Sequence, residues 1–306
     1  MIDQIQKDML KAVADLDSLP VGAYNIRANG QSAARNTTAN IDIVTKTDKP
    51  GIDIIVKPGT KKESVHIPVV LSQSGLKENV YNDFIIGEDC DVVIIAGCGI
   101  HNCGTDTSQH DGIHSFHVGK NSKVRYVEKH YGDGSGTGKR IMNPSTGVEL
   151  DEGATMEMEM TQSGGVDDTL RKTTAKLAAN ARLVIREALL TEGDQHAETD
   201  FTVTMEGAGS SADVVSRTVA KGHSTQHYAS RVIGNAPCAG HTECDSIIMD
   251  EAKVTAVPEL TANDLDASLI HEAAIGKIAG EQLIKLMTLG LTEQEAEEQI
   301  ISGFLK

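Results

Sequence analysis

Apolar and polar residues alternate over much of the chain from about residue 36 onward, and a period of two is that of a β-strand. Early examples are the segments 41–44, 52–56 and 65–69, which are rich in Ile and Val and are separated by Lys-Pro-Gly and Gly-Thr turns. Short β-branched runs between turns are typical of a β protein. We therefore expect strands through most of this range.

A short phrase recurs within this region: an apolar residue, five small or polar residues, and an apolar residue that opens the next strand. Successive phrases start at positions 86, 118, 150, 177 and 205, so the steps are 32, 32, 27 and 28 residues. Repeats of this size predict a solenoid in which each coil stacks on the one before. An antiparallel sandwich with frequent turns is the alternative. The phrases are Ile86-GEDCD-Val92, Val118-GKNSK-Val124, Leu150-DEGAT-Met156, Leu177-AANAR-Leu183 and Ile248-MDEAK-Val254, with a longer form from Met205 to Val214.

Helical periodicity is expected only at the two ends of the chain. At the start, Ile2, Ile5, Met9, Leu10 and Val13 fall on one helical face, and the segment 19–22 (Leu-Pro-Val-Gly) ends that helix. We therefore expect a helical segment over residues 1–35 and a β core over 36–258.

After residue 258 the spacing of apolar residues changes to three and four, which predicts a C-terminal helical domain over 259–306. Gly290 is placed to end one helix, and Thr292 with Glu295 forms a capping box that opens the next. The apolar face of the first helix consists of Ile275, Ile278, Leu283, Leu286 and Met287.

Composition narrows the range of functions. The chain has 28 Lys and Arg against 44 Asp and Glu, a formal charge of −16, and nine aromatic residues with no Trp. This charge argues against binding to nucleic-acid phosphates, and so few rings argue against base stacking. The narrow interior of a solenoid can be filled by aliphatic side chains instead.

Three further features predict a cytoplasmic protein that does not bind membranes. The longest apolar run, at about 92–100, is too short to span a bilayer, and the first ten residues lack the pattern of a secretory signal. The five cysteines are odd in number and widely spaced, which indicates reduced thiols.

One group of thiols and imidazoles suggests metal or sulfur chemistry. Cys98, His101 and Cys103 lie close in sequence, and three further histidines follow at 110, 114 and 117. Thiolate and imidazole are natural ligands of zinc and iron. The spacing matches no common zinc motif, and alternation along a strand would send some of the histidines to opposite faces, so an ordinary β-turn is the alternative.

The glycine-rich segment 131–140, YGDGSGTGKR, superficially resembles a phosphate-binding loop. Asp133 stands where such a loop needs its first glycine, and Arg140 replaces the Ser or Thr that would hold magnesium. We interpret the segment as a flexible turn without a nucleotide site.

A second group of candidate ligands surrounds Cys244. The segment 238–246 reads Cys-Ala-Gly-His-Thr-Glu-Cys-Asp-Ser, and His271 with Glu272 follows near the predicted C-terminal helices. A thiol, an imidazole and a carboxylate are suited to binding iron or an iron–sulfur cluster. A buried structural cysteine is the alternative.

These residues resemble the SufB/SufD family, the scaffold proteins of the SUF iron–sulfur cluster assembly system. The resemblance rests on HTECDSIIM at 241–249, LIHEAAIGKIAGEQLIKLMTLGL at 269–291 and EAEEQIISGFL at 295–305, and it extends over residues 30–306. The segments 80–102 and 110–119 are similar to the short SufB-like proteins of archaea and anaerobes.

The resemblance implies a mainly β fold, a right-handed parallel β-helix with flanking helices. It implies a scaffold rather than an enzyme. The scaffold would hold a labile iron–sulfur cluster for acceptor proteins, and a SufC-like ABC ATPase would hydrolyse ATP. That ATPase would bind the C-terminal helices. Two scaffold chains would pair through their β-helices, here as a homodimer.

The resemblance also assigns roles to single residues. Cys244 matches the assembly cysteine, His271 the histidine of the equivalent motif, and Glu272 the carboxylate that follows it in SufB. Ile270 stands where bacterial SufB tends to have an acidic residue. Cys98, Cys103 and His101 have no secure counterpart and form an additional metal or sulfur site in this interpretation. The alternative function is a metal-dependent hydrolase or lyase that uses the Cys98–His117 cluster.

Overall fold

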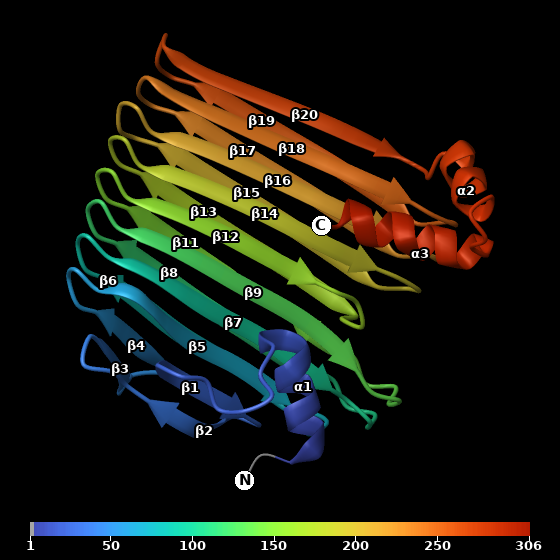
Figure 1. Ribbon diagram of the computed structural model, residues 1–306, viewed down its shortest axis with the longest axis horizontal. Coiled ribbons are helices and arrows are strands. Elements are labelled where there is room, and N and C mark those ends of the chain that lie inside the picture. Colours follow the sequence, from blue (N-terminus) through green and yellow to red (C-terminus); the bar gives the residue numbers. More distant parts are fainter. Residues whose placement is uncertain (1–2) are drawn as a thin grey trace.

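The chain folds into a β-solenoid of about eight turns, with one helix at its N-terminal end and two at its C-terminal end (Figure 1). This computed structural model describes residues 3–306. Two ten-stranded sheets face each other, and the chain passes from one sheet to the other as it winds. The predicted parallel β-helix is therefore confirmed, and the antiparallel sandwich is wrong.

The first sheet contains, in spatial order, β2 (Gln31–Asn36), β1 (Ala23–Ala28), β5 (Lys61–Leu71), β7 (Asp91–His101), β9 (Lys123–Asp133), β12 (Thr155–Gln162), β14 (Arg182–Thr191), β16 (Ser211–Ala220), β18 (Cys238–Ile248) and β20 (Ala267–Gly276). The second sheet contains β19 (Lys253–Ala262), β17 (Thr225–Gly234), β15 (His196–Met205), β13 (Asp168–Leu177), β10 (Arg140–Met142) with β11 (Ser145–Leu150), β8 (Ser108–Val118), β6 (Lys77–Ile86), β4 (Gly51–Val56) and β3 (Ile41–Thr45). The helices are α1 (Gln4–Ala14), α2 (Gly280–Met287) and α3 (Glu293–Phe304).

The repeat found in the sequence is the step from one coil to the next. In the second sheet Phe84 lies opposite Phe116, and in the first sheet Asp213 lies opposite His241. Strands of neighbouring coils run parallel, so each residue lies beside its counterpart one coil later. The recurring phrases form the turns between strands, for example between β6 and β7 and between β8 and β9.

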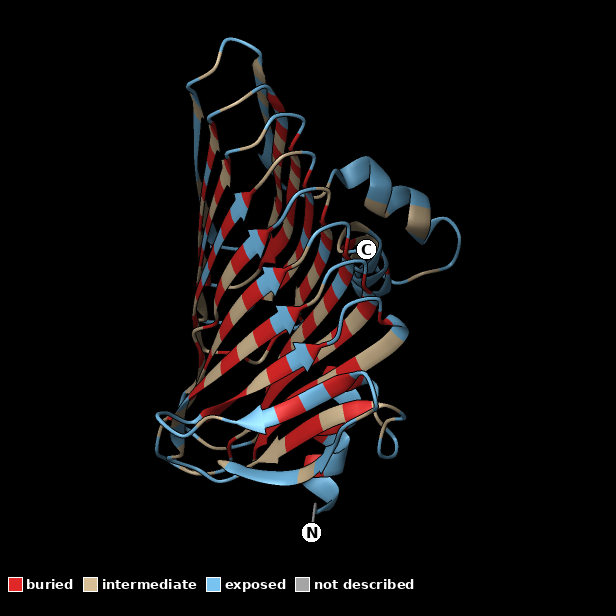
Figure 2. Cartoon of the chain, turned by 90° about the vertical axis from the view of Figure 1, so that its left-hand side faces the viewer, coloured by how far each residue is buried: buried red, intermediate tan, exposed pale blue. Residues whose placement is uncertain are grey.

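Side chains alternate between the interior and the surface along nearly every strand, as the striped burial in Figure 2 shows. The interior is mostly aliphatic, but the rings are not excluded from it. Phe84, Phe116 and Tyr126 are fully buried, and the two Phe rings stack with their centroids 4.1 Å apart. Coil stacking explains this, because residues 32 positions apart stand directly above one another.

A charged network is buried inside the solenoid, which sequence patterns did not indicate. Arg171 donates a 2.5 Å hydrogen bond to Glu128, and Tyr126 donates to the other oxygen of that carboxylate at 2.9 Å. His114 Nδ1 lies 2.8 Å from the Tyr126 hydroxyl. A buried charge is tolerated only when it is paired and hydrogen-bonded, and these side chains satisfy one another.

The structure corrects the expected helices at both ends of the chain. Of the described residues 3–35, only Gln4–Ala14 is helical, since residues 23–35 contain β1 and most of β2. Of the predicted helical face, Met9, Leu10 and Val13 are buried, Ile5 is 43% exposed, and Ile2 lies outside the described residues.

At the C-terminal end the strands continue past residue 258, through β19 and β20. The helical prediction is therefore wrong for Ile275, which lies on β20, and for Ile278, which lies before α2. Pairing of β20 with β18 along ten residues outweighs the local spacing. The capping box of Thr292 and Glu295 is confirmed at the start of α3.

The two ends of the solenoid differ. At the N-terminal end, the short strands β2 and β3 pair antiparallel with β1 and β4. At the C-terminal end, the ten-residue strands β19 and β20 are the last of their sheets, and their apolar side chains Val257, Ile270 and Ile275 are exposed. Within residues 3–306, no helix is long and apolar enough to cross a membrane.

The buried His114 makes stability sensitive to acid. Burial lowers its pKa to about 4 from 6.5, and His110, His130 and Arg171 act in the same direction, against Glu128. The pKa is lower in the folded state, so the unfolded state takes up the proton first, and stability is lost as the pH falls from about 6.5 towards 4.

We predict that His114→Gln reduces the loss of unfolding free energy between pH 7 and pH 5 by about 2 kcal/mol, as measured by urea denaturation at both pH values. His117→Gln, at an exposed position on the same strand, is the matched control. An unchanged pH dependence in His114→Gln would show that this imidazole is not held neutral.

Candidate functional site

Strand β18 carries the cysteine motif, and its alternation sends neighbouring residues to opposite sides of the sheet. Thr242 and Cys244 face the interior and are fully buried, whereas His241 and Glu243 are partly exposed on the outer face. β18 pairs in parallel with β16 on one side and with β20 on the other. The motif therefore supplies two different environments within four residues.

The inner side of the site contains a neutral thiol. Burial raises the pKa of Cys244 to about 11, and the charges of Glu187 and Asp245 add to this, against a hydrogen bond with Ser246. In this conformation Cys244 is a thiol and not a thiolate, so it becomes a good ligand only when a metal or a structural change removes its proton.

His271 lies on β20, directly opposite Thr242, so it belongs to the same inner side as Cys244. Its Nδ1 is 2.6 Å from the Thr242 hydroxyl oxygen. Its Nε2 is buried and has no hydrogen-bond partner among the residues described. Burial and the nearby His241 lower the pKa of His271, which leaves a neutral imidazole suited to metal ligation.

The outer side of the site brings together three potential metal ligands. Glu272 lies opposite Glu243 in the pairing of β20 with β18, and its carboxylate is 3.9 Å from His241 Nε2. One ligand atom from each of His241, Glu243 and Glu272 lies within 4.8 Å of the other two. An imidazole with two carboxylates is a donor set that suits a divalent ion such as Fe²⁺.

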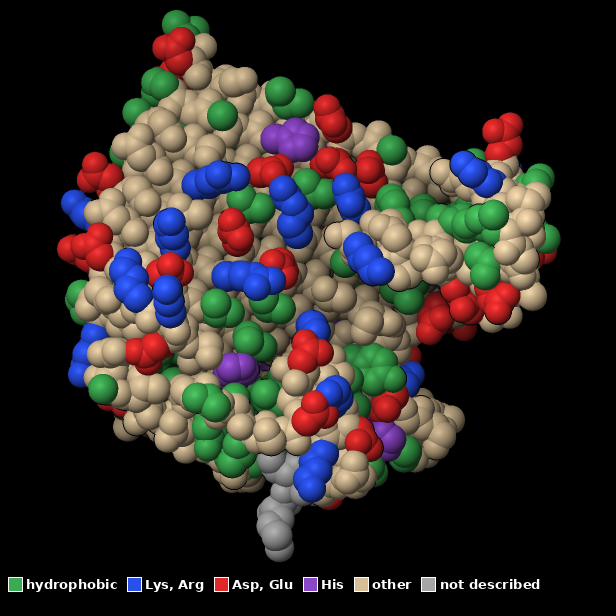
Figure 3. Space-filling model, viewed as in Figure 1, with side chains coloured by type: hydrophobic (Ala, Val, Ile, Leu, Met, Phe, Trp, Pro, Cys, Tyr) green, Lys and Arg blue, Asp and Glu red, His purple; other side chains and the backbone are tan. Residues whose placement is uncertain are grey.

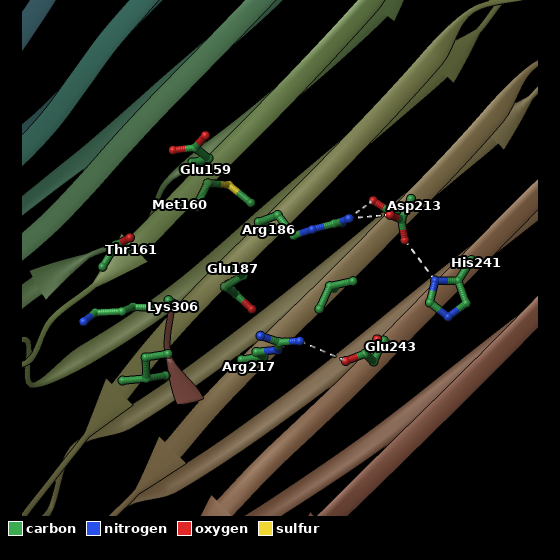
Figure 4. A pocket seen from close by; sticks show the side chains of 13 residues that line it. Glu159, Met160, Thr161, Arg186, Glu187, Asp213, Arg217, His241, Glu243 and Lys306 are labelled. Atoms are coloured by element: carbon green, nitrogen blue, oxygen red, sulfur yellow. Dashed lines mark hydrogen bonds and ion pairs between the residues drawn. The ribbon is translucent and has the colours of Figure 1, made fainter. Parts of the chain in front are cut away.

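The preceding coil holds His241 in position. Asp213, on β16, lies 2.9 Å from His241 Nδ1 and also pairs with Arg186 (Figure 4). Partial burial works to raise the pKa of Asp213, but hydrogen bonds from His241 and Arg186 outweigh it and lower the pKa. A metal-binding histidine is commonly oriented by a carboxylate that accepts a hydrogen bond from its other ring nitrogen.

Glu243 is less firmly ionised than Asp213. Burial raises the pKa of Glu243, and its neighbour Asp245 adds to the effect, while Arg217 and His241 act against it. Arg217 lies 3.8 Å from the Glu243 carboxylate. A cation at the site would relieve the repulsion between the carboxylates.

Two of the three outer residues, His241 and Glu243, border a groove of about 610 Å³ on the first sheet. Its walls include Arg186, Arg217, His241 and Glu243, and the last two residues of the chain, Leu305 and Lys306, complete it (Figure 4). Basic and acidic side chains are interleaved over this face of the molecule (Figure 3). The C-terminal helices therefore end beside the candidate metal ligands.

The three ligands predicted from the sequence, Cys244, His271 and Glu272, do not all lie on the same face of the sheet. Cys244 and His271 share the inner face of neighbouring strands, but Glu272 points outward. His241 and Glu243 were visible in the sequence motif without being selected as ligands. The coil step would have identified Asp213, because it lies 28 residues before His241.

The second candidate group is dispersed. Cys98 is buried, and burial, followed by the charges of Glu78, Glu128 and Asp111, raises its pKa well above the usual value. His101 and Cys103 do meet, with 3.0 Å between Nε2 and Sγ, but at the surface.

The three later histidines also separate. His110 and His114 point inward, where His110 pairs with Glu78 at 3.0 Å, while the exposed His117 pairs with Glu149 at 2.9 Å. Among the residues described, the Cys98–His117 segment therefore forms no single metal centre.

The expected partner surface is only partly on a helix. Leu283, Leu286 and Met287 lie on α2, and no residue of α2 is buried against the rest of the chain. α3 is held more firmly, through Ala296 and Ile301.

Comparison with known proteins identifies the family. The model for "SUF system FeS cluster assembly, SufBD core domain" matches residues 74–304. The chain is 31% identical over 264 residues to an iron–sulfur cluster assembly SufBD family protein of Archaeoglobus fulgidus, which covers 85% of this chain and 69% of the relative. A SufBD family protein of Methanothermobacter thermautotrophicus is 30% identical over 261 residues, 83% of this chain and 62% of the relative.

A further relative, from Pyrococcus horikoshii, is 28% identical over 300 residues, 96% of this chain and 84% of that protein. The chain spans less than two thirds of the length of both Methanothermobacter relatives, at 62% and 57%. The family match covers most of the solenoid together with both C-terminal helices. The chain belongs to the SufBD family of SUF-system iron–sulfur cluster assembly proteins.

Proposed function

We propose that this chain is the scaffold subunit of a SUF-type complex, on which iron–sulfur clusters are assembled for transfer to acceptor proteins. The main support for this proposal is the candidate site on β18 and β20, which has potential ligands on both faces of the sheet. A buried thiol and a free imidazole nitrogen lie on the inner side, and an imidazole with two carboxylates lies on the outer side.

The outer and inner sides of the site suit different forms of iron. Carboxylates and imidazole bind Fe²⁺ in an exchangeable way, whereas cluster iron prefers thiolate. Iron would first bind at His241, Glu243 and Glu272, and Cys244 with His271 would hold the growing cluster. Exchangeable ligands fit a scaffold, since a cluster held too tightly could not be released.

Access to Cys244 requires movement of the last coil. Cys244 is fully buried, and among residues 3–306 only β19 and β20 follow its coil at the C-terminal end of the solenoid. The unpaired edges and exposed apolar side chains at this end support pairing of two chains into a homodimer, which would bring two sites together. A change at this interface would expose the thiol.

The C-terminal helices connect the site to an ATPase. The exposed apolar residues of α2 offer a surface for a SufC-like ABC ATPase, and the end of the chain lines the groove beside His241. Movement of the helices by the ATPase would therefore reach the iron ligands directly. In this proposal the ATPase performs the hydrolysis and the chain itself is not an enzyme.

A metal-dependent hydrolase or lyase is not favoured. Such an enzyme would require the candidate ligands of the Cys98–His117 segment to converge on one metal. Some of these side chains are buried in the interior and the others lie at the surface instead.

We predict that Cys244→Ser removes the visible absorption of a cluster reconstituted anaerobically with Fe²⁺ and sulfide, because a hydroxyl is a poor ligand for cluster iron. Cys103→Ser, at an exposed thiol, serves as the control and keeps the absorption. If Cys244→Ser retains full absorption, the assignment to this residue is wrong.

The outer site gives a second prediction. Asp213→Asn should weaken binding of Fe²⁺, measured by anaerobic calorimetry, by about 10- to 100-fold, because it removes the charged support of His241. His241→Asn should weaken binding at least as much. Glu149→Gln, an exposed carboxylate beside His117, is the control. Equal affinity in all variants would exclude this site.

The ATPase surface gives a third prediction. Leu286→Asp on α2 should reduce co-purification with the partner ATPase by about tenfold, as expected for an apolar contact at the centre of an interface. The melting temperature should stay unchanged, because no residue of α2 is buried. Gln282→Asp on the same helix controls for added charge. Normal co-purification of Leu286→Asp would place the ATPase elsewhere.

A further inference from the structure

Cys103, in the loop between β7 and β8, forms a hydrogen-bonded group with His101 at the end of β7 and Asp133 at the end of β9, and the proposed function does not use this group. Cys103 is exposed, and its Sγ lies 3.0 Å from His101 Nε2. The other nitrogen of that ring, Nδ1, lies 2.6 Å from the Asp133 carboxylate. The Ser135 hydroxyl donates to Sγ over 3.8 Å. A nucleophile, a base and a group that orients the base therefore follow one another in space.

The coil repeat builds this arrangement. His101 and Asp133 end β7 and β9 and lie opposite each other in the parallel pairing. Cys103 and Ser135 are likewise 32 residues apart in the loops that follow. The group therefore spans two coils of the solenoid, and its members are held by separate strands.

The glycine-rich segment supports the loop closely. A Cβ atom at Gly134 would lie 2.3 Å from the Asn102 carbonyl oxygen, and one at Gly138 would lie 2.1 Å from that of Asp106. At Gly136 the nearest atom, the Gly104 carbonyl oxygen, would be 2.2 Å away. Only glycine allows such a close approach. The glycine-rich segment 131–140 therefore packs directly against the backbone of the loop that carries Cys103.

The surroundings favour the thiolate. Hydrogen bonds from Ser135, by its backbone N–H and then its hydroxyl, lower the pKa of Cys103, and the charge of His101 lowers it further. Partial burial works to lower the pKa of His101, but Asp133 and Cys103 outweigh it and raise the pKa. The proton of the thiol is thereby drawn towards the imidazole.

Cys103 differs in this respect from the other four thiols. Cys90, Cys98, Cys238 and Cys244 are all buried, and burial raises the pKa of the last three. Strands β9, β12, β14 and β16 separate β7 from β18, so the Cys103 group is remote from the candidate iron ligands.

We propose that Cys103, with His101 as its base and Asp133 as a positioning residue, is a thiol-exchange site that forms reversible mixed disulfides with small exposed disulfides. Cys103 Sγ attacks one sulfur of the disulfide and forms a new S–S bond. The original S–S bond breaks, and the departing sulfur leaves as a thiolate that takes its proton from His101. Cys103 is oxidised to the disulfide level, the departing half is reduced to a thiol, and a second thiol reverses the reaction.

The test is the reaction of the full-length, folded chain with the aromatic disulfide DTNB, followed by release of the coloured thiolate. The native chain should show one fast-reacting thiol, and Cys103→Ser should lose that phase while Cys244→Ser keeps it. Incubation with cystine, followed by intact-mass measurement before and after reduction, should show one removable adduct on the native chain and none on Cys103→Ser.

The roles of the neighbours are tested by the pH dependence of the fast phase. The groups that face Cys103 are His101 and Ser135, with Asp133 behind the imidazole. His101→Gln should slow the reaction at pH 7 by about tenfold, which corresponds to a rise of one unit in thiol pKa, and should move the pH midpoint upward. Asp133→Asn should move the midpoint in the same direction.

A fast phase that survives in Cys103→Ser would overturn the proposal. So would a rate and midpoint in His101→Gln and Asp133→Asn equal to those of the native chain. Iron binding of Cys103→Ser, measured in parallel, separates this site from the scaffold function, because loss of thiol exchange with normal iron binding supports two independent sites.

Discussion

The parallel hydrogen-bond ladder between successive coils is the constraint on which the rest of the structure depends. From β4 onward this ladder places each paired residue beside its counterpart 27 to 32 positions later, so residues far apart in the sequence become neighbours in the structure. Phe116 stacks on Phe84, and Asp213 orients His241, by this one rule. The charged interior obeys it as well, since Glu187 on β14 reaches Ser216 on the adjacent β16.

Alternation along each strand then decides which side chains face the interior of the solenoid and which face its outer surface. Within the segment 241–244 of β18, two side chains are buried in the interior and two line the outer groove. Burial raises the pKa of the thiol inside, while hydrogen bonds keep the carboxylate of Asp213 ionised outside. A single strand therefore presents a thiol on its inner face and an imidazole and a carboxylate on its outer face.

The sequence predicts the solenoid well because its signals, alternation and repeated turns, are local. It predicts the site less well, since the face on which Glu272 lies depends on the register of β20 against β18. The local spacing around Ile275 predicts a helix, because the gain from strand pairing that places this residue on β20 is not visible in local spacing. Local spacing does not indicate the ionic network of Arg171, Glu128 and Glu187 either, because these three residues come from three different strands.

The unequal ends of the solenoid limit how chains can join. The N-terminal end finishes in strands of six and five residues, β2 and β3, which offer little edge for pairing, while the C-terminal end finishes in two long strands with exposed apolar side chains. If two C-terminal ends paired, as in the proposed homodimer, the edges of both would be occupied. A solenoid with long open edges at both ends could add chains at either end, whereas in residues 3–306 the strands at the N-terminal end, β2 and β3, are short and paired antiparallel with their neighbours.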